Sequence, residues 1–521
     1  MFPRTPQVVK TLHRKHQCLT EISKKLLSTS PKPKDKTPYS RKEARNQNFK
    51  KESEYQYQKN LEASTKKDLL RNQDRKSSGT FESSQMPLRS KFMDPSFQSK
   101  KSRVLAGNYS KHEELNSSSK PEIIKELPDD DKEDVLFNTL FGARFIELNR
   151  PSKFNALNSS MIRKIIPRLQ EWAKSDMVNV IIIKGCGPKA FCAGGDVVEL
   201  VKLNRTGKEG QKESADYFAL EYKLDHLIAT YSKPYVAFMD GYTMGGGVGL
   251  SMHAPIRIAT ERTVFAMPET KIGLFPDIGA SFFLPRLTGS IGTYLGLTGS
   301  KIEGANVFYS GIATHYLHSS SLHSLEMRLA ELRFKDYDSL EERLGLLNST
   351  IKEFDTGLPH DQEILFTDKR LESINRCFDK GSITSILAAL EAEKEVDKPW
   401  AEEALKTLQA HSPTSLCVTL RLMQLGKKWS IAESFRREYM LAARFMEKSD
   451  FNEGVDALLI RKDLSPKWDP PVIADYETEN EIVEPYFKTE GIKPIKLLNE
   501  IDFQEYPHNN YGFRSRVDVK K

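Results

Sequence analysis

The sequence predicts an α/β domain with parallel strand pairing, preceded by a disordered basic extension that has no core of its own. From Val135 onward, short β-branched runs alternate with stretches of helical periodicity, as in strand–helix–strand units. Before that residue the chain is rich in Lys, Ser, Asn and Gln, and its few apolar residues show no sustained period. These two compositions divide the chain into an appendage and a body.

The net charge of the 521 residues, +7, combines two opposite parts. Residues 1–120 hold 27 Lys and Arg against 12 Asp and Glu, and residues 121–521 hold 51 against 59, which gives net charges of +15 and −8. Such asymmetry indicates a basic appendage on a slightly acidic body. No window offers the roughly 18 consecutive apolar residues of a membrane-spanning helix, so the sequence predicts no membrane insertion.

Residues 1–30 have the composition of a targeting segment. They hold six Lys and Arg residues against the single acid Glu21, and apolar residues such as Leu19, Ile22 and Leu26 could share one helical face. A basic, acid-poor, amphipathic start is typical of a mitochondrial transit peptide, so the sequence predicts import into the mitochondrial matrix. The alternative is a tail without a targeting role.

Residues 31–130 are predicted to be disordered, because they bury too little apolar surface to offset the entropy of ordering. Within them, residues 31–120 hold 21 basic and 11 acidic residues, with eight aromatic residues interleaved. Basic groups that neutralise phosphates and rings that stack on bases suit an RNA-binding arm. Residues 31–120 are therefore a candidate contact for mitochondrial rRNA or ribosomal proteins, and a solvated linker without a partner is the alternative.

The body is predicted to have a core over residues 131–320 and a helical carboxy-terminal region over residues 321–470. Strands are predicted over residues 143–148, 178–183, 235–239, 256–259 and 263–267, and helices over residues 161–172 and 214–230 and from the glycines at 245–247. Pro167 lies inside the first of these helices and is expected to bend it or to delay its start. Residues 471–521 are interpreted as a tail that is solvated or binds a partner.

Two glycine clusters, over residues 191–196 and 244–249, each follow a predicted strand and precede a predicted helix. Glycine allows close backbone approach, and the first N–H groups of a helix have no partner within it. Two such clusters that converge would supply two donors to an oxyanion, which suits chemistry at a polarised carbonyl. Tight turns alone would also explain either cluster.

Two carboxylates, Glu269 and Asp277, stand downstream of the second cluster and are flanked by Pro, Gly and apolar residues. Burial in such a turn would raise their pKa values and suit them to acid–base or nucleophilic work, whereas solvated loop positions are the alternative.

The five cysteines form no CxxC pair and the histidines show no ligand spacing. The sequence therefore predicts a reducing compartment, no disulfide framework and no metal site.

In this order, the motifs over residues 149–157, 190–196, 241–247 and 267–269 resemble those of the crotonase (enoyl-CoA hydratase/isomerase) superfamily. Further motifs, at residues 273–277, 411–415 and 451–468, are similar to those of its 3-hydroxyisobutyryl-CoA hydrolase branch, which acts in valine catabolism. The resemblance extends from about residue 134 to residue 470. It implies a spiral of strand–strand–helix units that binds an acyl-CoA thioester.

The resemblance also implies roles for individual residues. Ala193 and Gly246 would supply the N–H groups of the oxyanion hole, Glu269 would be the principal catalytic carboxylate, and Asp277 would orient the 3-hydroxyl of the substrate or assist. Glu221 falls on a further substrate-binding acid of the family, although a solvated helix face would also explain it.

Contacts to coenzyme A are implied nearer the start of the body. Lys153 and the run Asn155, Ala156 and Leu157 lie where the family approaches the adenosine end, and Lys153 is expected to pair with a phosphate. No separate cofactor is expected, since coenzyme A is part of the substrate.

One departure from the wider superfamily bears on the reaction. Hydratases carry a second catalytic glutamate at the position of Gly249, which has no side chain to activate water. Hydrolysis of 3-hydroxyisobutyryl-CoA, with Glu269 as general base or as a nucleophile that forms an anhydride, is therefore the leading hypothesis. A component of the mitochondrial small ribosomal subunit, alone or in addition to catalysis, is the second, because members of the family resemble such components. An enoyl-CoA isomerase or hydratase is the third.

Overall fold

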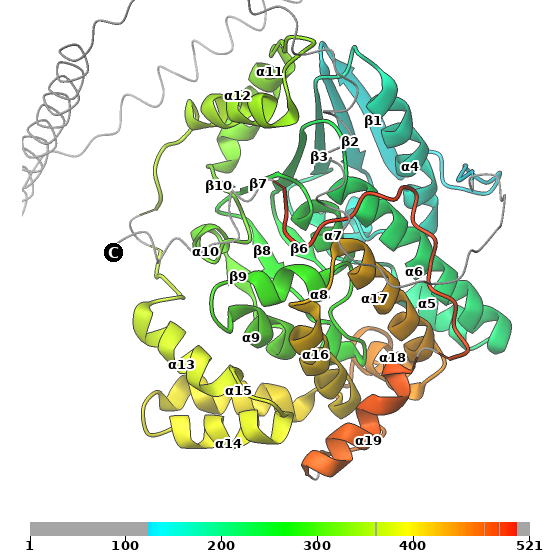
Figure 1. Ribbon diagram of the computed structural model, residues 1–521, viewed down its shortest axis with the longest axis vertical. Coiled ribbons are helices and arrows are strands. Elements are labelled where there is room, and N and C mark those ends of the chain that lie inside the picture. The colour runs from blue at the N-terminus through cyan, green and yellow to red at the C-terminus, as the bar shows by residue number, and fades with distance from the viewer. Residues whose placement is uncertain (1–122, 360–361, 474, 489, 508–521) are drawn as a thin grey trace, which may run out of the picture. The chain divides into compact units, whose positions relative to one another are not determined.

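The computed structural model describes residues 123–359, 362–473, 475–488 and 490–507 (Figure 1). The predicted transit peptide and residues 31–122 of the predicted extension lie outside the described residues, as do residues 508–521 of the predicted tail. No helix in the described part of the chain combines the length and the apolar character needed to cross a membrane.

A six-stranded sheet forms the first layer of the body. In spatial order it contains β1 (Val135–Leu140), β2 (Ala143–Leu148), β3 (Val180–Gly185), β5 (Tyr235–Met239), β7 (Ile256–Ala259) and β10 (His315–Tyr316). β1 and β2 form an antiparallel hairpin, and every later pair in this sheet is parallel. Buried β-branched runs such as that of β3 are typical of strands covered on both faces.

The body contains a second sheet of four strands. Its order is β4 (Ala190–Cys192), β6 (Tyr242–Met244), β8 (Val264–Ala266) and β9 (Ile302–Glu303), with β4, β6 and β8 parallel and β9 antiparallel to β8. Consecutive strands β3–β4, β5–β6 and β7–β8 each contribute one strand to each sheet. The first two pairs are followed by helices, so the chain forms a spiral of strand–strand–helix units. The predicted fold class is therefore confirmed.

Four helices of the core follow these strands. They are α4 (Ser159–Lys174), α5 (Val197–Asn204), α6 (Lys208–Ala229) and α7 (Gly246–Met252). Asn158 caps α4 by accepting a hydrogen bond from the N–H of Met161, so Pro167 does not delay the start of this helix. α6 begins six residues before the predicted start.

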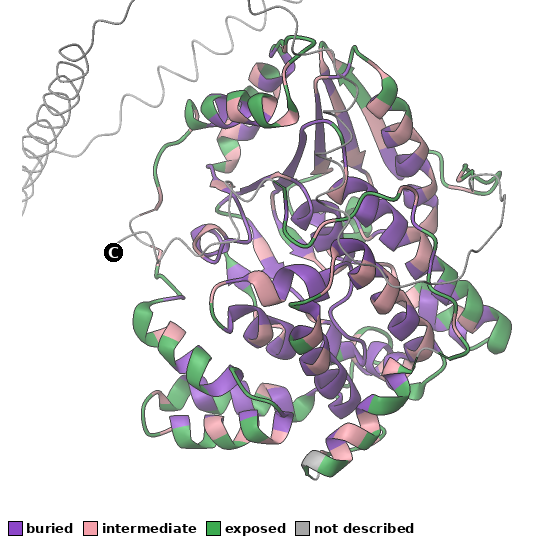
Figure 2. Ribbon diagram, in the orientation of Figure 1, coloured by how far each residue is buried: buried purple, intermediate pink, exposed green. Residues whose placement is uncertain are grey.

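The carboxy-terminal half of the described chain is mostly helical. Its helices are α8 (Ala280–Phe283), α9 (Ile291–Thr298), α10 (Ala305–Tyr309), α11 (Leu322–Ala330), α12 (Leu340–Lys352), α13 (Asp368–Phe378), α14 (Ile383–Glu393), α15 (Lys398–Ala410), α16 (Pro413–Gly426), α17 (Ile431–Met446), α18 (Ser449–Val455) and α19 (Tyr476–Phe487). Short 3-10 or π turns stand at η1 (Pro151–Lys153), η2 (Glu269–Ile272), η3 (Leu284–Arg286), η4 (Ser319–Ser321) and η5 (Asp456–Ile460). Figure 2 shows buried residues throughout the sheets and on α7, α8 and α16.

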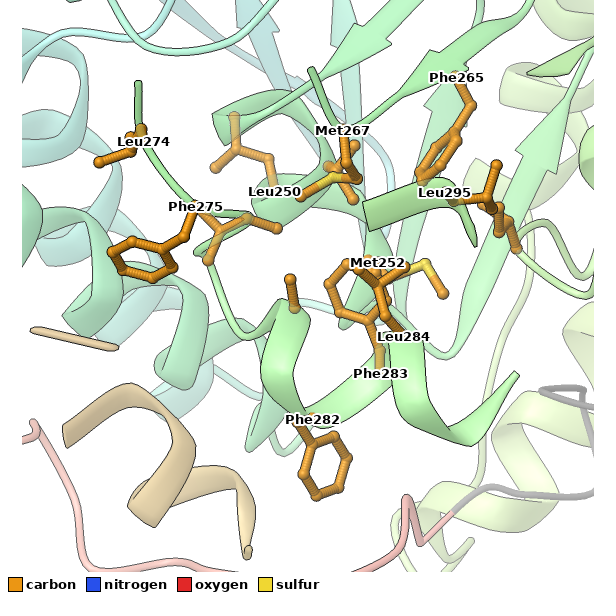
Figure 3. Close-up of a cluster of buried hydrophobic side chains, with 14 of the residues drawn as sticks. Leu250, Met252, Phe265, Met267, Leu274, Phe275, Phe282, Phe283, Leu284 and Leu295 are labelled. Atoms are coloured by element: carbon orange, nitrogen blue, oxygen red, sulfur yellow. The ribbon is translucent and has the colours of Figure 1, made fainter. Parts of the chain in front are cut away.

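The large sheet separates two apolar clusters. Along β3, Ile181 and Ile183 belong to the larger cluster, whereas Val180 and Ile182 belong to a smaller one that α11 and α12 cover. Figure 3 shows part of the larger cluster, in which side chains from α7, β8, α8, η3 and α9 pack together. This packing anchors both ends of the segment over residues 267–284, which carries Glu269 and Asp277.

Candidate active site

The two glycine clusters meet because their strands are neighbours. β4 pairs in parallel with β6, so the loops at their carboxyl ends lie side by side. A Cβ atom on Gly245 would lie 3.5 Å from the Cα atom of Gly194. The backbone of Gly194 has φ +113° and that of Gly245 has φ +46°, a region that residues with a side chain rarely adopt. Glycine is therefore required here both for the turns and for the close approach.

Gly246 begins α7, and the N–H of a first helical residue has no partner within the helix. A Cβ atom on Gly246 would lie 2.4 Å from Oε1 of Glu221 and 3.4 Å from the backbone nitrogen of Gly195. The two loops and a carboxylate thus converge on one point. Any side chain at this position would displace Glu221.

Ala193, the other expected oxyanion-hole donor, is engaged elsewhere in this structure. Its N–H donates a hydrogen bond of 3.0 Å to the carbonyl oxygen of Phe154. A substrate oxyanion could therefore receive this N–H only if the Phe154 carbonyl moved away. Donation by the N–H of Gly246 to an oxyanion stays a prediction.

Three carboxylates that the sequence analysis named are buried. Glu221 lies on α6, Glu269 opens η2, and Asp277 lies in the turn before α8; their exposed fractions are 2, 4 and 4%. Oε1 of Glu269 lies 3.1 Å from the position of a Cβ atom on Gly245. Glu221 therefore does not lie on a solvated helix face, and Glu221 and Glu269 both point at the glycine loops.

These carboxylates are short of hydrogen-bond partners. Among the described residues, Oε1 of Glu221 and Oε2 of Glu269 have none. Asp277 differs, because Oδ2 accepts a hydrogen bond of 2.7 Å from the hydroxyl of Tyr222. Buried acceptors without partners are costly, and they cluster where a substrate or water supplies the missing donors.

The environment shifts the titration of all three acids upward. Burial raises the pKa of Glu269 well above its ordinary value, and the charges of Asp277 and Glu221 raise it further. Burial raises the pKa of Asp277 to about 7, against the effect of the Tyr222 hydrogen bond. The pKa of Glu221 is raised well above its ordinary value by burial and by Asp277. Of the three acids, Asp277 is thus placed to exchange a proton near neutral pH.

A fourth buried acid, Asp225, was not identified from the sequence. It lies four residues after Glu221 on α6, and both of its carboxylate oxygens lack a partner among the described residues. A Cβ atom on Gly249 would lie 2.7 Å from Oδ2 of Asp225, so this glycine makes room for the carboxylate. Gly249 itself has no side chain to activate water, but the carboxylate of Asp225 lies beside it. The spacing of Glu221 and Asp225 was the available signal, because residues four apart share a helix face.

The segment before α4 holds the first glycine loop in place. The side chain of Asn155 is fully buried; it accepts from the N–H of Arg150 and donates to the carbonyl oxygens of Cys186 and Ala190. The N–H of Leu157 donates to the carbonyl of Gly194 at 2.8 Å. These hydrogen bonds hold the backbone around the first glycine loop, a role that was not predicted from the sequence for Asn155 and Leu157.

Ala156 and Lys153 complete this segment. The carbonyl of Ala156 accepts a hydrogen bond from the guanidinium of Arg150. Nζ of Lys153 lies 2.9 Å from a carboxylate oxygen of Asp196, and its side chain is 56% exposed. Pairing of Lys153 with a phosphate stays a prediction.

Comparisons with known proteins agree with this architecture. A family model described as enoyl-CoA hydratase/isomerase matches residues 143–487. The chain is 56% identical over 415 residues to small ribosomal subunit protein mS47 of Neurospora crassa, which covers 78% of this chain and 82% of that protein. It is 44% identical over 368 residues to the mitochondrial 3-hydroxyisobutyryl-CoA hydrolase of Gallus gallus, with 71% and 92% covered.

Among solved structures, a carnitinyl-CoA dehydratase from Mycobacterium thermoresistibile has a TM-score of 0.61 and 30% identity, over 69% of this chain and 98% of that one. The fold, the paired glycine loops and the family match lead to one assignment. The chain belongs to the enoyl-CoA hydratase/isomerase family, within the crotonase superfamily.

Proposed function

We propose that this protein is a hydrolase of the mitochondrial matrix that cleaves 3-hydroxyisobutyryl-CoA to 3-hydroxyisobutyrate and CoA, a step of valine catabolism. The observation that carries the proposal is the convergence of two buried carboxylates, Glu221 and Glu269, at the glycine backbone of Gly245 and Gly246; among the described residues, one oxygen of each carboxylate has no hydrogen-bond partner. The 44% identity to a protein named as this hydrolase supports the choice of substrate. No separate cofactor is proposed.

In the proposed reaction, the N–H of Gly246 binds the thioester carbonyl oxygen and stabilises the negative charge that develops on it. Water attacks the carbonyl carbon and passes a proton to ionised Glu269, and the C–S bond then breaks to release the thiolate of CoA. In the alternative route, the Glu269 carboxylate attacks the carbonyl carbon first, the C–S bond breaks to release the thiolate of CoA, and water then hydrolyses the resulting anhydride to the acid and free Glu269. A raised pKa makes Glu269 a stronger base in either route.

Asp277 is proposed to bind the 3-hydroxyl group of the acyl chain. Its Oδ2 atom is already engaged by Tyr222, and this hydrogen bond orients the carboxylate. Glu221 would hold the substrate from the side of α6. The two acids thus select an acyl chain that carries a hydroxyl donor.

The test is hydrolysis of 3-hydroxyisobutyryl-CoA by the wild-type chain and by Glu269→Gln, with thiol release as the readout. Loss of a general base or nucleophile is expected to lower turnover by about 10²- to 10⁴-fold. Glu213→Gln, at an exposed position of α6, is the matched control and should keep full activity. Undiminished turnover in Glu269→Gln would rule out the proposed mechanism.

A second role is proposed from a different observation. The 56% identity to a protein named small ribosomal subunit protein mS47 favours assembly with the mitochondrial small subunit. Residues 31–120, with their net charge of +10, would bind rRNA or ribosomal proteins. Catalysis and assembly use different parts of the chain, so one protein can do both.

Co-sedimentation with mitochondrial ribosomes tests this second role. The full chain is expected to sediment with the small subunit at low salt, and deletion of residues 31–120 should release it. Glu269→Gln should sediment like the wild type, which separates assembly from catalysis. A full chain that stays free of ribosomes at low salt contradicts the role.

Hydration of a crotonyl thioester distinguishes the third possibility. Because Gly249 has no side chain, little hydration is expected. Asp225 lies beside this glycine, so hydration that is found in the wild type and lost in Asp225→Asn would assign the activity to this acid.

A further inference from the structure

Residues 490–507, here called the strap, follow α19 and lie beyond residue 487, where the family match ends. Figure 1 shows this segment in red, crossing α6 and α17. Ile495, Leu497 and Tyr506 of the strap are buried and belong to the large apolar cluster. These three side chains therefore anchor the strap in the core, although the sequence suggested only a solvated or partner-binding tail.

The strap is bonded to the helix that carries Glu221 and Tyr222. A ring nitrogen of His226 on α6 lies 3.0 Å from the carbonyl oxygen of Ile501, and the amide of Asn499 donates to the hydroxyl of Thr230 at 2.9 Å. His226 is one turn from Tyr222 along α6. The strap thus holds the carboxyl-terminal part of this helix.

The strap also caps the amino-terminal end of α17. The N–H of Ile431 donates to the carbonyl of Phe503 at 2.9 Å, and the N–H of Ala432 donates to the Asp502 carboxylate at 3.0 Å. These two N–H groups have no acceptor within the helix, and the strap supplies an acceptor for each.

α17 in turn holds the turn after Asp277. The carboxylate of Glu438 accepts hydrogen bonds from the N–H groups of Gly279 and Ser281, at 2.6 and 2.9 Å, and from the Ser281 hydroxyl. A helix fixed at its start by the strap therefore binds the backbone two residues from a proposed substrate-binding acid.

A direct chain of hydrogen bonds reaches the same turn from Tyr506. Its hydroxyl lies 2.7 Å from Nδ1 of His253, and Nε2 of His253 lies 2.8 Å from the carbonyl oxygen of Ile278. A carbonyl only accepts, so Nε2 carries the hydrogen. Burial lowers the pKa of His253 to about 4, so the ring is neutral and Nδ1 accepts from the Tyr506 hydroxyl.

Ile278 needs such support, because its backbone has φ +57°. A β-branched residue is strained in this left-handed region and adopts it only when its surroundings enforce it. The ring of His253 also fills the space beside Gly279, where a Cβ atom would lie 2.6 Å from its Cε1 atom. The histidine therefore sets the conformation of the residues that follow Asp277.

We infer that the strap positions the proposed active site: Tyr506, through His253, holds Ile278 in its left-handed conformation and so keeps Asp277 against Tyr222. Tyr506 is a positioning residue, since it acts through His253. The expected effect on thioester turnover rests on the proposed function, whereas the positioning of the turn after Asp277 does not.

The test compares Tyr506→Phe with the wild type in the full chain. This change removes only the hydroxyl and keeps the ring packed against Phe282 and Phe503. Tyr486→Phe is the matched control, because the hydroxyl of Tyr486 on α19 makes no hydrogen bond within the described residues. Asn499→Ala, which loosens the strap on α6, is a second variant expected to act in the same direction.

The first readout is amide hydrogen exchange over residues 277–283, which needs no substrate. Exchange there should become faster in Tyr506→Phe and stay unchanged in Tyr486→Phe. Unchanged exchange in Tyr506→Phe overturns the inference, whatever the protein catalyses. Faster exchange in a protein that hydrolyses no thioester supports the positioning of the turn, and in that case it is the proposed function that is contradicted.

The second readout is the choice of substrate. Turnover of 3-hydroxyisobutyryl-CoA should fall roughly tenfold in Tyr506→Phe, the effect of losing one buried hydrogen bond. Turnover of isobutyryl-CoA, which lacks the 3-hydroxyl, should change little, so the preference for the hydroxylated substrate falls. Equal losses with both thioesters would show that the strap does not act on Asp277.

Discussion

Replacing Asp277 by Asn should stabilise the fold while it impairs catalysis. The side chain is 4% exposed, and its pKa is raised from 3.8 to about 7, chiefly by burial. Asn keeps the shape and can still accept the hydrogen bond from Tyr222, but it removes a charge that the interior disfavours. The change therefore separates the cost of burying an ionised carboxylate from the contacts of the side chain.

The size and the sign of this effect follow from proton linkage. An acid whose pKa is higher in the folded state contributes stability below its unfolded pKa, and this contribution is lost as the pH rises through the folded value. A shift of about three units corresponds to about 4 kcal/mol at high pH. Between pH 5 and 8, the advantage of Asp277→Asn in free energy of unfolding should grow by about 2–3 kcal/mol.

Urea unfolding followed by tryptophan fluorescence at pH 5, 6, 7 and 8 measures this difference. Asp216→Asn, at an exposed position of the same helix as Tyr222, is the control for removal of a carboxylate that is not buried. If the difference between Asp277→Asn and the wild type stays constant from pH 5 to 8, the buried acid does not titrate as inferred. The same variant should lose its preference for the 3-hydroxylated thioester.

Three further predictions use independent features. Gly246→Ala should lose most thioester hydrolysis, because its Cβ atom would lie 2.4 Å from Oε1 of Glu221, whereas Gly345→Ala, which has open space around it, should keep full kcat/KM. The kcat/KM for hydrolysis should rise with pH through about pH 7, since Asp277 and Glu269 act as ionised groups and their pKa values are raised; a flat profile from pH 5.5 to 8.5 would contradict this. Lys164→Met should lower the free energy of unfolding by about 3–5 kcal/mol in urea titrations, because it leaves the buried Asp134 carboxylate without its partner.

Local sequence patterns predicted the elements of the core well, because the responsible signals lie within a few residues. The strands over residues 143–148, 235–239 and 256–259 match the structure residue for residue, since each is a buried apolar or alternating run. The helix around Pro167 starts earlier than that proline would suggest, because the Asn158 cap outweighs it. The strands β4, β6, β9 and β10 were missed, since runs of two or three residues carry too little pattern, and the six-residue strand β1 was not predicted either.

The candidate site was predicted in part. The glycine clusters stood out because each follows a predicted strand and precedes a predicted helix, and Glu269 and Asp277 stood out because Pro, Gly and apolar residues flank them. Asp225 and Glu438 did not stand out, because an acid on a helix is ordinarily solvated and only its neighbours decide otherwise. Asn155 was expected to contact coenzyme A, whereas its side-chain hydrogen bonds all go to the protein backbone.

The sequence by itself determined the fold class, the division into a basic appendage and a mildly acidic body, and the glycines of the two loops. These are local properties, set by periodicity, charge and the absence of a side chain. Only the tertiary structure decided that α6 turns Glu221 and Asp225 inward, that the carbonyl of Phe154 accepts from the N–H of Ala193, and that the strap reaches His253. Burial and hydrogen bonding across some 250 residues of sequence depend on which elements pack together, and no local pattern encodes that packing.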